Sequence, residues 1–132
     1  MSQENLEIIR RQNEAFNRGG DDWVEFYDSE AELHMPPGGW FDDPVYTGHD
    51  GIKRAAALWT EAVSEYHWEI AKLIDAGDCV VGLYRFHSRV TEGGAWLEPP
   101  LAAIFDLRQG KIVRALTYFS WDEALKAAGL EE

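Results

Sequence analysis

Two residues that could carry chemistry, Arg85 and His87, lie two positions apart at the end of an apolar run. Side chains alternate between the two faces of a strand, so residues 79, 81, 83, 85 and 87 project to the same side. Histidine titrates near neutral pH and can act as a general acid or base, while arginine binds carboxylate or enolate oxygens. This pattern predicts a pocket with Arg85 and His87 as its catalytic pair. The competing interpretation is that Arg85 forms a structural ion pair near the sheet edge and His87 is half exposed.

The composition is that of one small acidic domain. Its 132 residues are enough to bury a core without disulfides, so we expect a single domain over residues 1–132. Lys and Arg number 12 against 24 Asp and Glu, for a net charge of −12, which disfavours nucleic acid and anionic lipid as partners. No leader-like segment and no apolar stretch near the roughly 20 residues of a membrane span occur, so we expect a cytoplasmic protein.

The spacing of potential ligands argues against a bound metal or nucleotide. The four histidines (34, 49, 67 and 87) form no pair at ligand spacing, and Cys79 is the single cysteine. No glycine-rich loop precedes a helix in the manner of a phosphate-binding site. We therefore expect chemistry or binding without a cofactor.

The elements that must position these residues begin with helices. A helix is predicted from Ser2 to Arg18 with Asn13 on its apolar face, where the amide either lines a pocket or is a satisfied core group. A short second helix over residues 21–27 and a strand over 31–35 follow. Residues 36–48 are predicted to form an irregular loop, in which Asp42 and Asp43 could place an acid at a cavity mouth. A third helix is expected from Asp50 to Tyr66.

The second half of the chain has the pattern of a sheet. Strands are predicted over residues 68–74, 79–91, 96–107 and 111–121, separated by short turns that contain glycine. Short turns between consecutive strands imply an antiparallel meander. A closing helix is expected over residues 121–130. Helices followed by a curved antiparallel sheet predict an α+β fold.

Five segments, in this order, resemble the SnoaL-like branch of the nuclear-transport-factor-2-like superfamily. They are NEAFNRGG (13–20), YDSEAELHMPP (27–37), YTGHDGI (46–52), DLRQGKIV (106–113) and DEALKAAGL (122–130). The resemblance implies a cone-shaped α+β barrel, in which a curved antiparallel sheet wraps around the N-terminal helices and encloses a hydrophobic cavity. Members include polyketide cyclases, ketosteroid isomerases and limonene epoxide hydrolase, so the fold alone does not determine the function.

The resemblance and the strand pattern together suggest which residues bind a small hydrophobic molecule in that cavity. The candidates are Asn13, Phe16, His34, Met35, Tyr46, Trp59, Thr117 and Phe119. The pattern leaves open whether Leu33 and Met35 or Glu32 and His34 face inward on the strand over residues 31–35.

The carboxylates that the related enzymes use are missing from this chain. The resemblance implies that Met35 or Pro36 occupies the position of the general base in the isomerases. Gln12 or Asn13, together with Ala102, occupies the positions of their oxyanion donors. Thr117 occupies the position of an acidic residue in the hydrolases and cyclases. Two functions stay open. One is a cofactor-independent isomerase, cyclase, lyase or hydrolase acting on a small apolar substrate through His87. The other is a protein that binds such a ligand without converting it.

The apolar residues opposite Arg85 and His87 predict an assembly. Val80, Gly82, Tyr84 and Phe86 share the second face of their strand, and no spare helix is evident in the sequence to cover it. An exposed apolar face of several hundred Å² is uncommon in a monomer. We therefore expect a homodimer through this outer sheet face, as the resemblance also implies.

Overall fold

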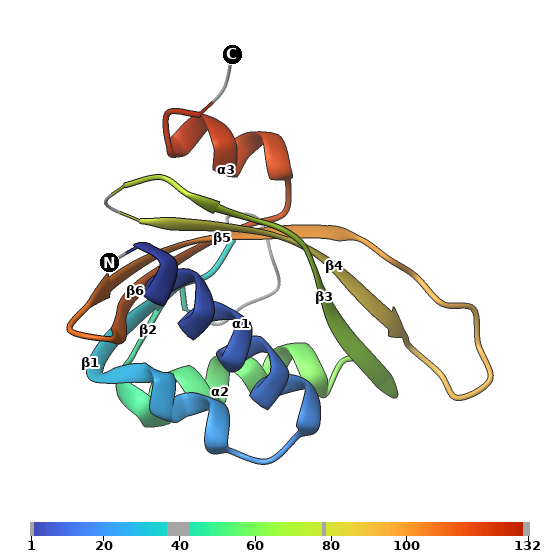
Figure 1. The fold of residues 1–132 in the computed structure, drawn as a ribbon. Helices are drawn as coiled ribbons and strands as arrows, with labels where there is room; N and C mark the ends of the chain where they lie inside the picture. The colour runs from blue at the N-terminus through green and yellow to red at the C-terminus, as the bar shows by residue number, and fades with distance from the viewer. Residues whose placement is uncertain (1, 37–42, 78, 131–132) are drawn as a thin grey trace.

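A curled six-stranded sheet with helices on both faces forms the molecule (Figure 1). The computed structural model describes residues 2–36, 43–77 and 79–130. Its elements in chain order are α1 (Ser2–Arg18), the 3₁₀-helix η1 (Asp22–Phe26), β1 (Tyr27–His34), β2 (Val45–Thr47), α2 (Gly48–Thr60), β3 (Glu65–Asp75), β4 (Val80–Arg89), β5 (Pro100–Arg108), β6 (Lys111–Tyr118) and α3 (Trp121–Ala127). Helices α1 and α2 cover the concave face, and α3 lies on the opposite face. The α+β fold with a curved sheet is therefore confirmed.

The strand order is β2-β1-β6-β5-β4-β3. Strands β3 to β6 form the predicted antiparallel meander. Strand β1 instead pairs with β6 in parallel and with the short β2 in antiparallel orientation. The long connection makes the parallel pair possible, because the chain passes through α2 and four strands before it returns to the neighbour of β1. The sheet is thus mixed at one position and unclosed.

Extra residues in two strands bend the sheet around the helices. The register between β3 and β4 shifts between Ile70 and Lys72, which leaves Ala71 without a partner. The register between β5 and β6 shifts in the same manner at Val113. A bulge of this kind increases the local twist and turns the strand. The curvature gives the sheet a concave face deep enough to hold α1 and α2.

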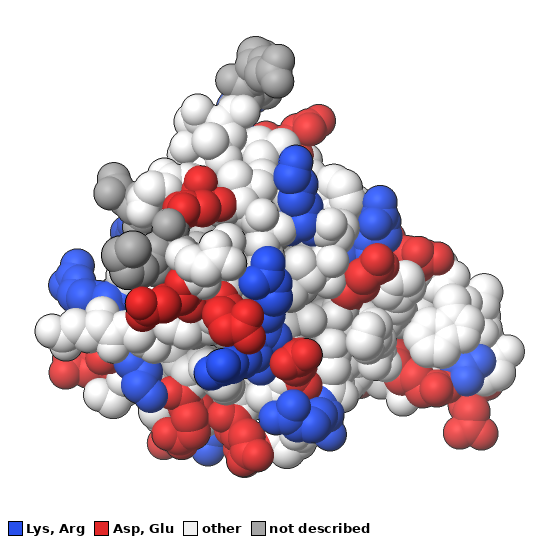
Figure 2. Space-filling model, viewed as in Figure 1, with Lys and Arg blue, Asp and Glu red and all other residues white. Residues whose placement is uncertain are grey.

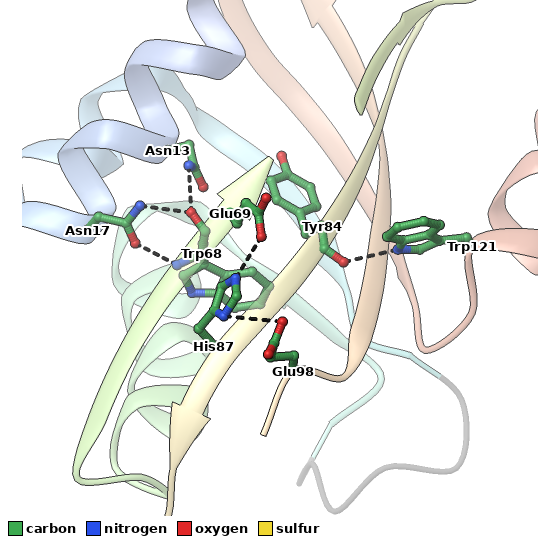
Figure 3. Close-up of polar contacts among 8 residues, drawn as sticks. All are labelled: Asn13, Asn17, Trp68, Glu69, Tyr84, His87, Glu98 and Trp121. Carbon is green, nitrogen blue, oxygen red and sulfur yellow. Dashed lines mark hydrogen bonds and ion pairs between the residues drawn. The ribbon is translucent and has the colours of Figure 1, made fainter. Parts of the chain in front are cut away.

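Helix α1 closes the free edge of β3 at Trp68 (Figure 3). Asn17 accepts a hydrogen bond from the Trp68 backbone N–H at 2.8 Å and donates one to its carbonyl at 2.9 Å. Asn13 donates a second bond to that carbonyl at 3.0 Å. The Asn17 amide thus takes the place of a neighbouring strand at an edge whose backbone groups would otherwise lack a protein partner.

Helix α3 covers the opposite face of the sheet, which corrects the basis of the dimer prediction. Val81, Leu83 and Ile104 pack with Ala124 and Leu125 of this helix. The indole N–H of Trp121 donates to the carbonyls of two paired residues, Tyr84 at 3.0 Å and Leu101 at 3.1 Å.

The residues that the sequence assigned to a dimer interface lie on the other side of β4. Val80 and Tyr84 belong to the core under α1 and η1, and the Phe86 ring packs on Trp59 and Trp68. The interface assigned to this face is therefore wrong, because these side chains are inside the molecule. The homodimer itself stays a prediction.

Two element boundaries also differ from the sequence prediction. Helix α2 ends at Thr60, and Tyr66 lies in β3 instead of at the end of the helix. Strand β2 lies within the segment predicted as an irregular loop. Residues 37–42 of that loop, which include Asp42, fall outside the described residues. Within the described ranges, no helix is long and apolar enough to cross a membrane.

Acidic and basic side chains are mixed on the surface. On the face in Figure 2, Asp and Glu lie beside Lys and Arg, and no continuous basic surface forms there. Ion pairs of the described residues include Arg114 with Asp106 at 2.8 Å and Arg54 with Asp43 at 3.5 Å. The mixture reduces like-charge repulsion in a chain with a net charge of −12.

The substitution Phe86→Glu tests the inward orientation of this face. Phe86 is 5% exposed, and the centroid of its ring lies 4.3 Å from the ring centroid of Trp68. A carboxylate there has no partner, so the free energy of unfolding should fall by about 4 kcal/mol or more. Urea unfolding followed by tryptophan fluorescence measures this change. His67→Glu, at an exposed site on the neighbouring strand, is the control and should change stability by less than about 1 kcal/mol. A stable, folded Phe86→Glu protein would contradict the orientation.

Candidate active site

The concave face of the sheet and the helices over it border a pocket of about 110 Å³. Helix α1 contributes Gln12, Asn13 and Phe16, and α2 contributes Ile52, Ala56 and Trp59. The remaining lining residues are Trp23, Tyr27, Leu33, Pro36, Trp68, Tyr84, Leu101, Ala102, Ala103, Phe105, Ala115, Thr117 and Tyr118. The lining is therefore mainly aromatic and aliphatic, with a few polar tips.

The lining follows from the periodicity of each element. Gln12, Asn13 and Phe16 lie within four residues on α1, which places them on one face of the helix. Ala115 and Thr117 share one face of β6 in the same manner at a spacing of two. On β4, Tyr84 reaches the pocket because its ring lies over Gly82. A Cβ on Gly82 would lie 2.7 Å from that ring, so glycine is required for this arrangement.

The predicted catalytic pair lies on the opposite face of the sheet. The Arg85 guanidinium lies 4.9 Å from the ring centroid of Trp121 in α3. The two nitrogens of His87 lie 2.6 Å from Glu69 and 3.6 Å from Glu98 (Figure 3). Neither side chain is part of the described pocket lining. The prediction that they face the cavity is wrong, because both faces of β4 are apolar and α3 covers the one that carries Arg85.

On the outer face His87 lies between two carboxylates, those of Glu69 and Glu98. The hydrogen bond from His87 lowers the pKa of the Glu69 carboxyl, and the charges of His87, Arg85 and His67 act in the same direction. Burial opposes this shift only in part. The competing interpretation expected an ion pair of Arg85 and a half-exposed His87. His87 is partly exposed, but the ion pairs are its own, and Arg85 stacks on Trp121. Within the described ranges, no group of three or more His, Cys, Asp or Glu side chains could hold a metal ion.

Of the residues predicted to bind a ligand, four line the pocket. They are Asn13, Phe16, Trp59 and Thr117. Asn13 meets both open alternatives, since it lines the pocket while its amide bonds to the Trp68 carbonyl. The Thr117 hydroxyl donates to the carbonyl of His34 at 2.5 Å. These two polar groups therefore have partners within the protein.

The other four predicted residues are outside the lining. Leu33 faces the pocket, so His34 faces outward, where it lies 3.0 Å from Glu32. Met35 and Tyr46 are buried together in a separate cluster with Ala55 of α2. The ring centroids of Phe119 and Trp59 lie 6.4 Å apart, but Phe119 is 37% exposed. The sequence left open which side chains of β1 face inward. In the structure Leu33 lines the pocket and Met35 is buried, so these two face inward and His34 faces outward.

Among the lining residues that were not predicted to bind a ligand, three with polar groups had a signal in the sequence. Gln12 lies three positions after Ile9, about one turn along α1, and Tyr84 shares a face of β4 with Phe86 two positions later. Tyr27 lies where η1 meets β1. Burial raises the pKa of Tyr27, and burial followed by the neighbouring Tyr27 raises the pKa of Tyr84. Both phenols therefore stay protonated at neutral pH, which leaves each hydroxyl able to donate a hydrogen bond.

The described lining contains no side chain that is charged at neutral pH. It contains no Asp, Glu, His, Lys, Arg or Cys. At two positions where the resemblance implies a carboxylate in related enzymes, the chain has Ala102 and Thr117, and both line the pocket. The pocket is thus electrically neutral over the residues that the structure describes.

The SnoaL-like domain model matches residues 9–115 of this sequence, which is most of the chain. The chain belongs to the SnoaL-like family. The match covers α1 through most of β6 and so includes nearly all of the pocket. No curated protein matches the sequence.

Solved structures share the fold of this SnoaL-like protein at low sequence identity. TerC, co-crystallized with polyporic acid, has a TM-score of 0.77 and 19% identity, over 96% of this chain and 98% of that chain. A proposed polyketide cyclase from Xanthomonas campestris has a TM-score of 0.70 and 22% identity, over 96% and 97%. A ketosteroid isomerase-like protein from Catenulispora acidiphila, in complex with trimethylamine, has a TM-score of 0.71 and 20% identity, over 95% and 94%.

The variant His87→Ala tests the contact between His87 and Glu69 on the outer face. Removal of the hydrogen bond and the nearby cation should raise the pKa of Glu69 toward its ordinary value. NMR titration of the Glu69 carboxyl measures the shift. In the parent protein the pair stabilises the fold above the pKa of glutamate in the unfolded chain, and this contribution is lost as pH falls through the lowered folded-state value. A Glu69 titration unchanged in His87→Ala would contradict the assignment.

Proposed function

We propose that this protein binds a small, largely apolar and uncharged molecule in the pocket between the sheet and the two helices. The observation that carries the proposal is the neutral aromatic lining. Binding sites of this type are mostly apolar with a few polar groups that orient the ligand. The lining supports binding in preference to acid–base catalysis by His87, because that side chain lies on the other face of the sheet.

The size of the pocket supports a small ligand. Its volume is about 110 Å³. An apolar cavity of about 150 Å³ holds benzene, while pockets for drug-sized ligands have roughly 300–1,000 Å³. A ligand of one ring, or one ring of a larger molecule, matches the pocket without rearrangement. The fold also accommodates other organic molecules, since TerC was crystallised with polyporic acid and the Catenulispora protein with trimethylamine.

The electrostatics favour an uncharged ligand. An anion would enter a protein with a net charge of −12 and would meet no cationic side chain in the described lining. Transfer of a carboxylate from water into such a site costs several kcal/mol without a partner. The guanidinium of Arg85, which the sequence suggested for this task, is stacked on Trp121 on the other face.

Enzymatic turnover is the second candidate function. It is favoured by membership of a family with polyketide cyclase-type neighbours and by the two protonated phenols, Tyr27 and Tyr84. Neutral donors of this kind stabilise an oxygen that gains negative charge in a transition state. Such an enzyme would act through these hydrogen bonds, and His87→Ala would leave its activity unchanged.

Charge selectivity is the first test of the proposed function. Acetophenone and benzoate have nearly the same size and shape, but only benzoate is charged at neutral pH. Acetophenone should bind, and benzoate should bind at least about a hundredfold more weakly, because its charge loses hydration without a cationic partner. Isothermal titration calorimetry measures both affinities. Equal affinity for the two compounds would contradict a neutral site.

A variant that fills the pocket is the second test. Ala56 lines the pocket, whereas Ala57, next to it on α2, does not. Ala56→Leu should weaken acetophenone binding about tenfold or more, because the larger side chain occupies the space of the ligand. Ala57→Leu is the matched control and should retain the parent affinity. The same affinity in the Ala56→Leu protein would show that the compound binds elsewhere.

A further inference from the structure

The pocket lining includes Trp68, whose indole N–H is buried without a hydrogen-bond partner, and the half-buried Tyr118. Three further lining side chains are more deeply buried and carry an amide or hydroxyl group. They are Gln12 on α1, Tyr27 at the start of β1 and Tyr84 on β4. Gln12 is 9% exposed, Tyr27 6% and Tyr84 5%. Neither the Gln12 amide nor the two hydroxyl groups make a hydrogen bond to the described part of the chain, whereas Asn13 and Thr117 in the same lining are each bonded to a backbone carbonyl.

The polar tips of these three side chains remain accessible although the residues are mostly buried, because the Trp68 indole nitrogen is the one fully buried side-chain polar atom without a partner in the described part of the chain. Polar groups inside folded proteins usually have a hydrogen-bond partner, so accessible groups in a pocket are available to a ligand or to water. Phenylalanine would pack as well as tyrosine against Trp23 and Trp68, which contact Tyr27 and Tyr84 through their rings. The hydroxyl groups therefore contribute nothing to these packing contacts. Packing explains the rings and leaves the polar tips unexplained.

The three groups come from separate elements but border the same small cavity. Tyr27 and Tyr84 are close enough for their phenols to influence each other electrostatically. In a pocket of about 110 Å³, a ligand of one ring that contacts the sheet also approaches the helix over it. The fold thus brings two hydroxyl groups and one amide to the surface of one ligand.

We propose that Gln12, Tyr27 and Tyr84 form the recognition subsite of the pocket and bind an uncharged carbonyl oxygen of the ligand. This inference rests on the proposed function. A phenol hydroxyl donates to a carbonyl oxygen, and the amide N–H₂ of Gln12 adds a further donor. The ligand class is therefore a small cyclic or aromatic ketone or quinone, instead of a pure hydrocarbon.

The properties of the two tyrosines support this role. Both phenols remain protonated at neutral pH, since burial raises their pKa values. A protonated phenol donates a hydrogen bond to an oxygen and cannot itself serve as a base. Gly82 leaves the space in which the Tyr84 ring lies, so the position of this hydroxyl is determined by the backbone beneath it.

Paired probes and paired variants test the subsite. Acetophenone and α-methylstyrene have nearly the same shape, but only acetophenone carries a carbonyl oxygen. Their affinities are measured by calorimetry for the parent, Gln12→Met, Tyr84→Phe and Tyr66→Phe. Tyr66 packs against Phe16 and Phe86 outside the pocket lining and provides the matched control. Thermal unfolding of each protein without ligand is the second readout.

The parent should bind acetophenone roughly three- to tenfold more tightly than α-methylstyrene, which corresponds to one or two net hydrogen bonds. Tyr84→Phe and Gln12→Met should each remove most of this preference and leave the affinity for α-methylstyrene unchanged. Neither should lower the unfolding temperature, because no hydrogen bond within the protein is lost. Tyr66→Phe should keep the parent preference.

The outcomes separate this inference from the proposed function. Equal binding of both probes by the parent, or a preference that survives in both variants, would overturn the subsite while the apolar pocket stands. Binding of neither probe would overturn the proposed function and the subsite together. A drop in unfolding temperature for Tyr84→Phe, with the preference for acetophenone retained, would assign the hydroxyl to the protein's own structure.

Discussion

The hydrogen bonds between the Asn17 side chain and the backbone of Trp68 are the constraint on which the rest of the structure depends. They hold α1 against the edge of β3, so the helix cannot move away from the sheet without exposing two backbone groups. With α1 in place, Phe16 packs against Trp23 and Trp68, and the pocket is bounded on the helix side. The same contact protects a free strand edge from pairing with another chain.

Local patterns in the sequence were sufficient for most of the fold. The turns with glycine predicted the meander from β3 to β6, and an apolar helical face that includes Asn13 predicted α1. The pairing of β1 with β6 was not predictable in this manner, because it joins segments about eighty residues apart and depends on the path of the whole chain. Strand β2 has three residues and is defined by its partner β1, so its own sequence carries little signal.

The orientation of β4 shows why the site was harder to predict than the fold. Hydrophobic residues occur on both of its faces, since Val81 and Leu83 contact α3 while Val80 and Tyr84 contact the other core. Parity groups the side chains of a strand correctly but cannot tell which group faces the cavity when both are apolar. Interpreting Arg85 as a pocket residue also excluded Tyr84, which was taken as part of an apolar face. One error in orientation therefore accounts for the misplaced pair and the missed tyrosine.

The absence of a side chain at Gly82 has a consequence for how this chain could diverge. The Tyr84 ring fills the volume that a Cβ on residue 82 would need. Any other residue at position 82 would displace the ring, and a small residue at position 84 would remove the reason for glycine at 82. The two positions should therefore change as a pair in descendants of this sequence. Lineages that keep the glycine and an aromatic residue two positions later would inherit the same pocket wall, whereas lineages that replace both would be free to acquire a different ligand.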